Sequence, residues 1–338
     1  MNTAKLLESL SYQNSCKTRF FAEDYAYSFL SMRGTVKRDV SGNIIALLPG
    51  VSEGTLLLDA HIDQIGFVVT HIDEKGFLRV AKSGGVDLSV ISGQEVVVWG
   101  KTPLRGVISI QPPHLVSEEK KVPDIGDFSI DIGLPKKQAE ALVSEGDFIT
   151  FAMPGKRMKN SRFTAPALDN RAGVASLLLA AESLAGKELP VTVAILLSSG
   201  EELGCRGAVT AAFGLEPEAC ICVDVSFGDS PDTPKTKCGT LGNGPMIGIS
   251  PILDRDMADT LQKLAKKDNI PCQLEVMGGE CGTNADVISN SREGVRTAML
   301  SIPLRNMHTP AEIVHLEDVE KTSELIVSYI RNGGERHA

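Results

Sequence analysis

Five segments of the sequence place an acid or a histidine after an apolar run, and several kinds of chemistry need such residues. They read LLLDAHIDQIG, APALDNRAG, VAILLSSGEELGCRGA, ACICVDVSFG and AMLSIPLRNMHTP, and carry in turn His61 with Asp63, Asp169, the pair Glu201 and Glu202, Asp224, and His308. Imidazole nitrogens and carboxylate oxygens are donors that Zn²⁺, Co²⁺ and Mn²⁺ accept in proteins. The pattern therefore predicts a metal site assembled from distant parts of the chain.

This donor set suits the hydrolysis of an amide bond. A bound divalent cation lowers the pKa of water to ~7 and so supplies a nucleophile at neutral pH. One carboxylate that bridges two cations can hold them ~3.5–4 Å apart. The adjacent Glu201 and Glu202 can divide two tasks, because one can bind metal while the other takes a proton from the water. We expect two divalent cations per chain, Zn²⁺ first, with Co²⁺ or Mn²⁺ as alternatives.

A sheet covered by helices can bring the five segments together. Apolar strands are predicted at TLLLDA, Val191–Ser198, Ala219–Val225 and Thr297–Ile302, and helices at Asn170–Ala185, Gly207–Phe213, Asp254–Lys267 and Leu316–Arg331. This alternation predicts an α/β domain with a mostly parallel sheet flanked by helices. The carboxyl ends of such strands face the ligand crevice, so the five segments are expected to meet at one edge.

Residues 70–156 differ from the rest of the chain in composition and in the pattern of predicted strands. They are rich in Gly and Val, and short strands are predicted at Phe77–Val80, Glu95–Trp99, Gly106–Ile110 and Asp147–Phe151, with a helical segment at Pro135–Glu145. This pattern predicts a small β-barrel-like domain inserted into a discontinuous catalytic domain of residues 1–69 and 157–338. Because its strands carry none of the candidate residues of the five segments, the insertion is expected to serve assembly more than chemistry.

The first residues are predicted to form helix and then a hairpin. Phe20, Phe21, Tyr25, Phe29 and Leu30 lie roughly on one helical stripe, so the first 33 residues are expected to be helical. Residues 34–49 resemble a hairpin with a Ser-Gly-Asn turn.

Composition excludes several classes of protein. The 338 residues carry a net charge of −9 without a long Lys/Arg run, so no nucleic-acid partner is expected. No apolar run approaches the ~20 residues of a membrane span, and the first residues lack the apolar stretch of a signal peptide. The 7 cysteines include no CxxC pair, which is typical of reduced thiols in the cytoplasm.

In this order, the five segments resemble the tetrahedral (TET) aminopeptidases, family forty-two of the metallopeptidases, which includes glutamyl aminopeptidases and proteins of the cellulase M type. The resemblance runs from about residue 45 to residue 330 and includes GVISIQPPH and DFSIDIGLPKKQAEALVSEGDFITF. It implies that His61 and Asp224 bind one ion, that Glu202 and His308 bind the other, and that Asp169 bridges them. It also implies that Glu201 is the general base and that Asp63 orients His61.

The resemblance further implies a zinc-peptidase-like catalytic domain, an inserted dimerisation domain, and a homo-oligomer of twelve subunits around a central cavity. Three positions depart from the family pattern: Gln64 in HIDQIG, Asn170 in LDNRAG, and Asn284 in CGTNADVI. None replaces a ligand implied by the resemblance, but each changes the surroundings of the site. His114 in QPPH resembles a family motif, and both a packing role and a role in the active site stay open.

The leading hypothesis is an aminopeptidase that cleaves peptides with a free N-terminus. One alternative is a related two-metal deacylase, which the inserted β-rich block disfavours. An endoglucanase is another, but glycosidases use two carboxylic acids without needing metals, and aromatic residues for sugar stacking make up only 5% of the chain. A non-catalytic shell protein is the third, disfavoured by the complete ligand set. The preferred N-terminal residue and the choice between dimer and dodecamer remain open.

Overall fold

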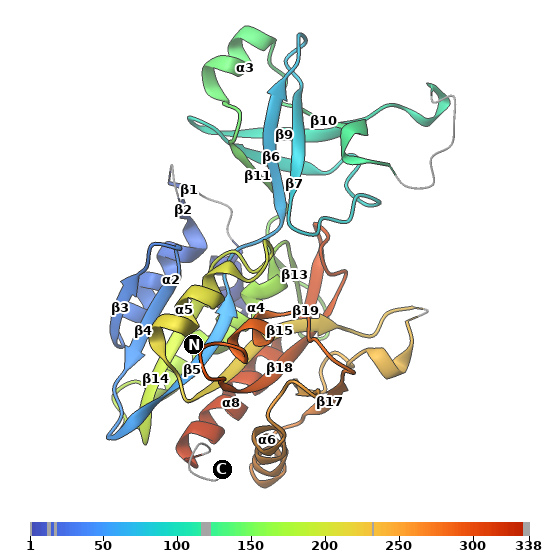
Figure 1. The fold of residues 1–338 in the computed structure, drawn as a ribbon. Coiled ribbons are helices and arrows are strands. Elements are labelled where there is room, and N and C mark those ends of the chain that lie inside the picture. Colours follow the sequence, from blue (N-terminus) through green and yellow to red (C-terminus); the bar gives the residue numbers. More distant parts are fainter. Residues whose placement is uncertain (1, 12–14, 17–18, 116–122, 232, 334–338) are drawn as a thin grey trace.

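The computed structural model describes residues 2–11, 15–16, 19–115, 123–231 and 233–333. A large sheet covered by helices carries a smaller barrel at one end, and the chain enters the barrel after β5 (Figure 1). Within the described ranges, no helix is both long enough and apolar enough to span a membrane.

The large sheet has 11 strands in the described part of the chain. Its main path runs in the order β12-β13-β19-β18-β15-β5-β14-β4-β3, and β16 pairs with β18 and with β17. The central strands β18, β15, β5 and β14 are parallel, and the other pairs along the main path are antiparallel. Off this path, β16 is antiparallel to β18 and parallel to β17. This confirms the predicted α/β architecture. The strands are β3 (Thr35–Arg38), β4 (Ile44–Leu48), β5 (Ser52–His61), β12 (Lys156–Arg157), β13 (Arg162–Ala165), β14 (Val191–Ser198), β15 (Ala219–Phe227), β16 (Met246–Ile249), β17 (Gln273–Val276), β18 (Arg296–Arg305) and β19 (Glu312–His315).

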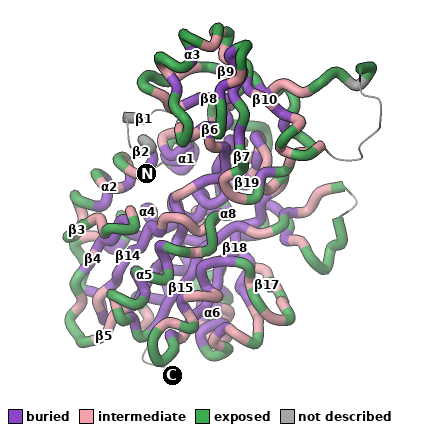
Figure 2. Tube along the Cα trace, turned by 45° about the horizontal axis from the view of Figure 1, so that its top comes forward, coloured by how far each residue is buried: buried purple, intermediate pink, exposed green. Residues whose placement is uncertain are grey.

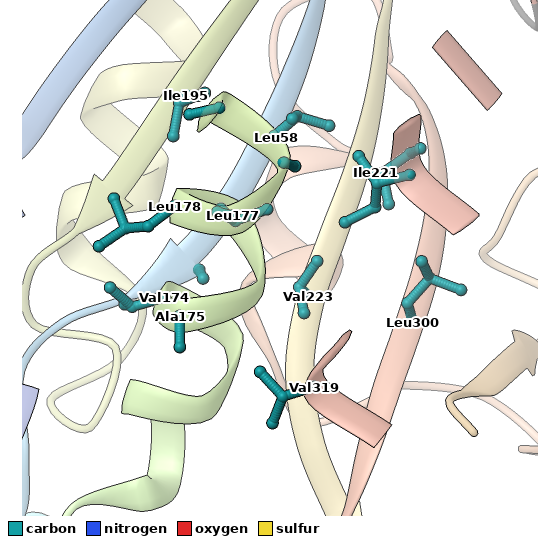
Figure 3. Close-up of a cluster of buried hydrophobic side chains, with 14 of the residues drawn as sticks. Leu58, Val174, Ala175, Leu177, Leu178, Ile195, Ile221, Val223, Leu300 and Val319 are labelled. Carbon is teal, nitrogen blue, oxygen red and sulfur yellow. The ribbon is translucent and has the colours of Figure 1, made fainter. Parts of the chain in front are cut away.

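Helices cover both faces of this sheet. The helices of this domain are α1 (Thr3–Leu10), α2 (Phe21–Ser31), α4 (Leu168–Leu184), α5 (Arg206–Leu215), α6 (Arg255–Lys267), α7 (Asn284–Ile288) and α8 (Leu316–Arg331), and the short 3-10 helix η3 (Lys235–Lys237) lies in the connection between β15 and β16. In Figure 3, Val174, Leu177 and Leu178 of α4 lie against the central strands, where Leu58 and Ile221 are also buried. A parallel strand buried on both faces is apolar along its length, which explains runs such as Val191–Ser198.

The inserted block forms a closed barrel in the order β10-β7-β6-β11-β8-β9, counted over the described residues. Its elements are β6 (Gly66–Ile72), β7 (Leu78–Ser83), β8 (Glu95–Trp99), β9 (Pro103–Ile110), η1 (Pro113–Leu115), η2 (Ile125–Asp127), β10 (Phe128–Asp131), α3 (Lys136–Leu142) and β11 (Phe148–Phe151). A separate apolar core fills it, and buried segments run through both domains in Figure 2. The predicted β-barrel-like insertion is therefore confirmed, and its first strand begins at Gly66 rather than after residue 70.

The prediction of one helical stretch over the first 33 residues is wrong. Helix α1 ends at Leu10 and α2 begins at Phe21, and the short strands β1 (Ser15–Cys16) and β2 (Arg19–Phe20) pair between them. The Leu10 carbonyl at the end of α1 accepts a hydrogen bond from buried Arg171, a contact that the local pattern does not contain. Residues 12–14 and 17–18 lie outside the described residues. The predicted hairpin is confirmed, because β3 and β4 are antiparallel neighbours.

Candidate metal centre

The five predicted segments converge at one edge of the large sheet. His61 is the last residue of β5, and Glu201 and Glu202 follow β14. The Cα atoms of His61 and Ser198 are partners in the β5–β14 ladder, so these two strands end at the same level. Asp224 lies near the end of β15, and His308 follows β18.

Asp169 reaches the same edge from the start of α4. The backbone at Asp169 and Asn170 is not helical, so the regular helix begins after them. Asn170 Oδ1 accepts a hydrogen bond from the Gly173 amide at 3.0 Å, which caps the first turn. Asn170 Nδ2 donates to the Val223 carbonyl at 2.8 Å, next to Asp224. A carboxylate at position 170 could not make this second bond, so the departure from the family pattern has a structural role here.

Within the described residues, two groups of side chains could each hold a metal ion. In the first, His61 Nε2 lies 3.1 Å from Asp169 Oδ1 and 3.6 Å from Asp224 Oδ1. In the second, His308 Nε2 lies 3.3 Å from Asp169 Oδ2 and 3.6 Å from Glu202 Oε1. The candidate ligand atoms of each group all lie within 4.8 Å of one another. Asp169 belongs to both groups and directs a different oxygen to each.

The electrostatics of these groups fit bound cations. His61, Asp169 and Asp224 are buried, and ionised carboxylates so enclosed need compensating charge. Burial raises the pKa of Asp224, and burial followed by repulsion from Asp169 raises the pKa of Glu202 to about 7. Burial also acts on Asp169, but hydrogen bonds from His308 and His61 hold its pKa well below the usual range. Divalent cations would neutralise this concentration of negative charge.

Asp63 ties the end of β5 to the loop after β14. Its Oδ1 lies 3.4 Å from His61 Nδ1, on the side of the ring opposite Asp169. The same carboxylate accepts hydrogen bonds from the amides of Glu201 at 3.1 Å and Glu202 at 3.2 Å. Burial opposes its ionisation, but the hydrogen bond with His61 lowers the pKa of Asp63. Asp63 therefore contacts both the imidazole of one group and the backbone that carries the glutamate pair.

Glu201 lies near the first group, but its carboxylate is farther from His61 than those of Asp169 and Asp224. Its Oε2 lies 4.0 Å from His61 Nε2, and the Cys205 thiol donates to its Oε1 at 3.7 Å. Burial raises the pKa of Glu201 to about 8. Nearby carboxylates also raise it, whereas His61 lowers it. This places a group that can exchange a proton near neutral pH beside the candidate metal ligands.

Sequence reasoning missed Glu312. Its buried carboxylate accepts hydrogen bonds from the amides of Asp169 and His308, each at 2.9 Å. One side chain thus fixes the backbone of the residue shared by both groups and of a ligand in the second. His308 itself has φ of 62°, a strained left-handed conformation that this bond helps to hold. An acid four residues after a candidate ligand was the signal available in the sequence.

Arg171 anchors the N-terminal segment to the site. Its buried guanidinium donates from Nε to the Ile62 carbonyl at 3.1 Å and from Nη1 to the Leu10 carbonyl. Burial lowers its pKa to about 10, although Glu23 and Asp63 act in the opposite direction. The end of α1 is thereby tied to the residue that follows His61.

The barrel also contacts the site, which the prediction for the insertion overlooked. His308 Nδ1 lies 3.0 Å from the carbonyl oxygen of Gly85, and the Asp87 amide donates to the His308 carbonyl at 3.2 Å. A Cβ on Gly85 would lie 2.6 Å from His308 Nδ1, so only glycine leaves room for the ring. The loop after β7 therefore orients a candidate ligand.

The remaining predicted positions lie around the site or away from it. Gln64 is buried. Asn284 Nδ2 donates to Asp59 Oδ2 at 2.9 Å and to Ser198 Oγ at 2.8 Å. His114 is exposed in η1.

Comparison with known proteins shows the family of the chain. The family model for M42 glutamyl aminopeptidases matches residues 42–325. The chain belongs to this family. A lysyl aminopeptidase from Pyrococcus furiosus is 36% identical over 297 residues, which cover 86% of this chain and 85% of that protein.

Solved structures show the same fold in both domains. An aminopeptidase from the archaeon Desulfurococcus kamchatkensis has a TM-score of 0.91 at 32% identity, covering 98% of this chain and 94% of that one. The Pyrococcus horikoshii TET1 peptidase, described as able to assemble into a tetrahedron or a large octahedral shell, has a TM-score of 0.85 at 30% identity, covering 97% and 99%. This M42 chain is therefore a peptide hydrolase with the TET aminopeptidase fold.

Proposed function

We propose that this chain is a dinuclear-metal aminopeptidase that removes the first residue from peptides with a free N-terminus. Asp169 carries the proposal, because its two oxygens face His61 at 3.1 Å and His308 at 3.3 Å. This is the arrangement expected of a carboxylate shared by two cations. Under the proposal, the ligands are His61 and Asp224 for one ion, Glu202 and His308 for the other, and Asp169 for both.

Two divalent cations bound there, Zn²⁺ or alternatively Co²⁺ or Mn²⁺, would lower the pKa of water and polarise the substrate carbonyl. Glu201 would accept the proton of the attacking water and pass it to the departing amine. A general base works best with a pKa near the working pH, and the pKa of Glu201 is raised to about 8, first by burial. Asp63 would keep His61 oriented and hold Glu201 in place through its amide.

A free α-amino group is the feature that separates an aminopeptidase from the alternatives. The site gathers several carboxylates at one edge of the sheet, and a peptide's N-terminal ammonium can be anchored among them. Such anchoring fixes which peptide bond reaches the water, and positioning of this kind contributes strongly to catalysis. An acetyl cap removes the charge and adds bulk at the same place.

The test compares a short peptide, its N-acetylated twin and carboxymethyl-cellulose under the same metal conditions. Stepwise release of single residues from the free peptide alone would support the proposal. Comparable cleavage of the acetylated peptide would instead indicate a deacylase or an endopeptidase, and release of sugar would indicate a glycosidase. Metal analysis after chelation and reconstitution should reach about two ions per chain, and a plateau at one would contradict the dinuclear centre.

We also propose that the chain forms a homo-oligomer through its barrel, up to a tetrahedral dodecamer. The support is the similarity to the TET1 peptidase, which is described as able to assemble into a tetrahedron or a large octahedral shell. Replacing residues 70–156 by a short Gly/Ser linker should then give smaller species in sizing chromatography with light scattering. Because the loop after β7 contacts His308, assembly and not activity is the proper readout for this variant.

A further inference from the structure

A cavity of about 250 Å³ lies beside the edge strand β17. Its lining includes Met246, Glu275 and Met277 from β16, β17 and the residue after β17, and Lys235 and Lys237 from η3. Pockets for drug-sized ligands begin at ~300 Å³. The cavity is therefore of a size suited to one amino-acid side chain.

Glu275 connects this cavity to the metal centre. Ser226 Oγ and Ser301 Oγ each donate a hydrogen bond to a different oxygen of its carboxylate. Ser301 is the partner of Asp224 in the β15–β18 ladder, and Ser226 lies two residues after Asp224 on the same strand. Alternate residues of a strand point to the same face, so the Glu275 carboxylate lies on the face that carries Asp224.

The distance between the candidate metal ligands and Glu275 matches the reach of the first side chain of a peptide. Neighbouring strands lie ~4.8 Å apart, and same-face residues of one strand lie ~6.6 Å apart. Ser301 is therefore one strand away from Asp224, and Ser226 is one same-face position away. Because both hydroxyls bind the Glu275 carboxylate, that carboxylate lies within about 10 Å of Asp224. A substrate whose first carbonyl lies at the candidate ligands has its first Cα one bond away. A long first side chain can therefore extend to Glu275.

Glu275 also has the electrostatics of a cation site. Both of its hydrogen bonds come from neutral hydroxyls, which stabilise the carboxylate without cancelling its charge. An ionised carboxylate has about four acceptor positions, so capacity remains for an ammonium or guanidinium group. Lys235 and Lys237 also line the cavity but are exposed, so solvent and salt screen their charges.

We propose that Glu275 is the specificity-determining residue for the first side chain of the peptide and selects lysine or arginine there. This inference rests on the proposed aminopeptidase function. The cationic head of the side chain would hydrogen-bond to Glu275. Its methylene stem would lie against Met246 and Met277, as long basic side chains lie along apolar surfaces.

The test uses the metal-reconstituted full chain and the p-nitroanilides of lysine, norleucine and glutamate. Norleucine matches the lysine stem without the ammonium group. In the wild type, kcat/KM for the lysyl substrate should exceed that for the norleucyl substrate by at least about tenfold. Glu275→Gln should lower the lysyl value by about ten- to a hundredfold, the worth of a charge-assisted hydrogen bond, and leave the norleucyl value within about threefold. Glu280→Gln, at an exposed acid of the same segment, is the control and should keep the preference.

Other results would overturn the inference. If the wild type prefers the norleucyl substrate, a carboxylate in the pocket does not select the side chain. If it prefers the glutamyl substrate, Lys235 and Lys237 select the side chain instead of Glu275. An equal fall for all three substrates in Glu275→Gln would show that the residue supports the fold rather than selectivity. Cleavage of none of the three by the wild type would contradict the aminopeptidase function itself. Calorimetric binding of L-lysine against L-norleucine then decides on the pocket separately, with tighter binding of L-lysine supporting the proposal and equal binding overturning it.

Discussion

The Nδ1 atom of His308 lies 3.0 Å from the carbonyl oxygen of Gly85, although 223 positions separate the two residues in the sequence. Gly85 follows barrel strand β7, so the inserted domain orients a candidate ligand of the sheet domain. A hydrogen bond at one ring nitrogen sets the tautomer and leaves the other nitrogen for a metal. The barrel is thus part of the candidate metal centre as well as the proposed assembly domain.

Gly85→Ala should weaken metal binding at the Glu202–His308 side of the centre. The added Cβ would lie 2.6 Å from His308 Nδ1, so the ring has to move and lose its contact with the carbonyl. Loss of such an orienting contact typically lowers metal affinity about 10- to 100-fold. Calorimetric titration of the chelator-treated protein measures this as a weakened second binding step.

Gly126→Ala is the matched control, because a Cβ there meets open space in the same barrel. It should bind both ions as the wild type does. If Gly85→Ala also binds both ions with unchanged affinity, the contact between the barrel and His308 has no role in holding the metal.

Glu312→Gln should destabilise the metal-free protein. The carboxylate accepts one amide hydrogen bond on each oxygen, from Asp169 and His308. A carboxamide keeps one acceptor and turns an NH₂ group toward the other donor, so a buried amide loses its partner at a cost of about 1–3 kcal/mol. Urea unfolding monitored by circular dichroism measures the change, and Glu293→Gln at an exposed position is the control. Equal midpoints for the two variants would contradict this role for Glu312.

The sequence was sufficient to predict the converging segments because the signals are local. An apolar run that leads to His61 or Asp224 indicates a buried strand and also the place where a polar side chain meets the crevice. Glu312 and Gly85 could not be found in this way. Their roles depend on which backbone amide or imidazole lies opposite them after folding, and no periodicity records such a partner.

The same distinction explains the error near the N-terminus. Phe29 and Leu30 of the predicted apolar stripe are buried in α2, but the stripe does not show where the helix begins. The end of α1 is fixed by a distant contact, since the Leu10 carbonyl accepts a hydrogen bond from buried Arg171. A pattern within 33 residues contains no information on that partner.

Metal binding should weaken as the pH falls. The hydrogen bond with Asp169 raises the pKa of His308 to about 9, and burial raises the pKa of Glu202 to about 7. A cation binds only the deprotonated groups, so it competes with one proton between about pH 7 and 9 and with two below about pH 7. The apparent affinity of this side should fall about tenfold per pH unit in the first range and about a hundredfold per unit in the second.

Titration at fixed ionic strength in buffers of different ionisation enthalpy tests this, because it counts the protons released per ion. Binding of the ion held by Glu202 and His308 should release about two protons below pH 7 and about one near pH 8. Release of none at pH 6 would mean that both groups are already deprotonated in the protein without cations.

The last prediction separates the two adjacent glutamates. Glu202 Oε1 lies 3.6 Å from His308 Nε2 within a candidate metal group, whereas Glu201 is outside both groups and has its carboxylate 4.0 Å from His61 Nε2. Glu201→Gln should therefore keep about two ions per chain but lower kcat by at least ~10²–10⁴-fold, the usual contribution of a general base. Glu202→Gln should lose affinity for one ion, and excess metal should restore part of its turnover. Each variant is the other's control, since both replace a carboxylate by an amide of the same shape one residue apart. Near-normal kcat in Glu201→Gln would show that another group takes the proton, and loss of an ion from that variant would make Glu201 a ligand rather than the base.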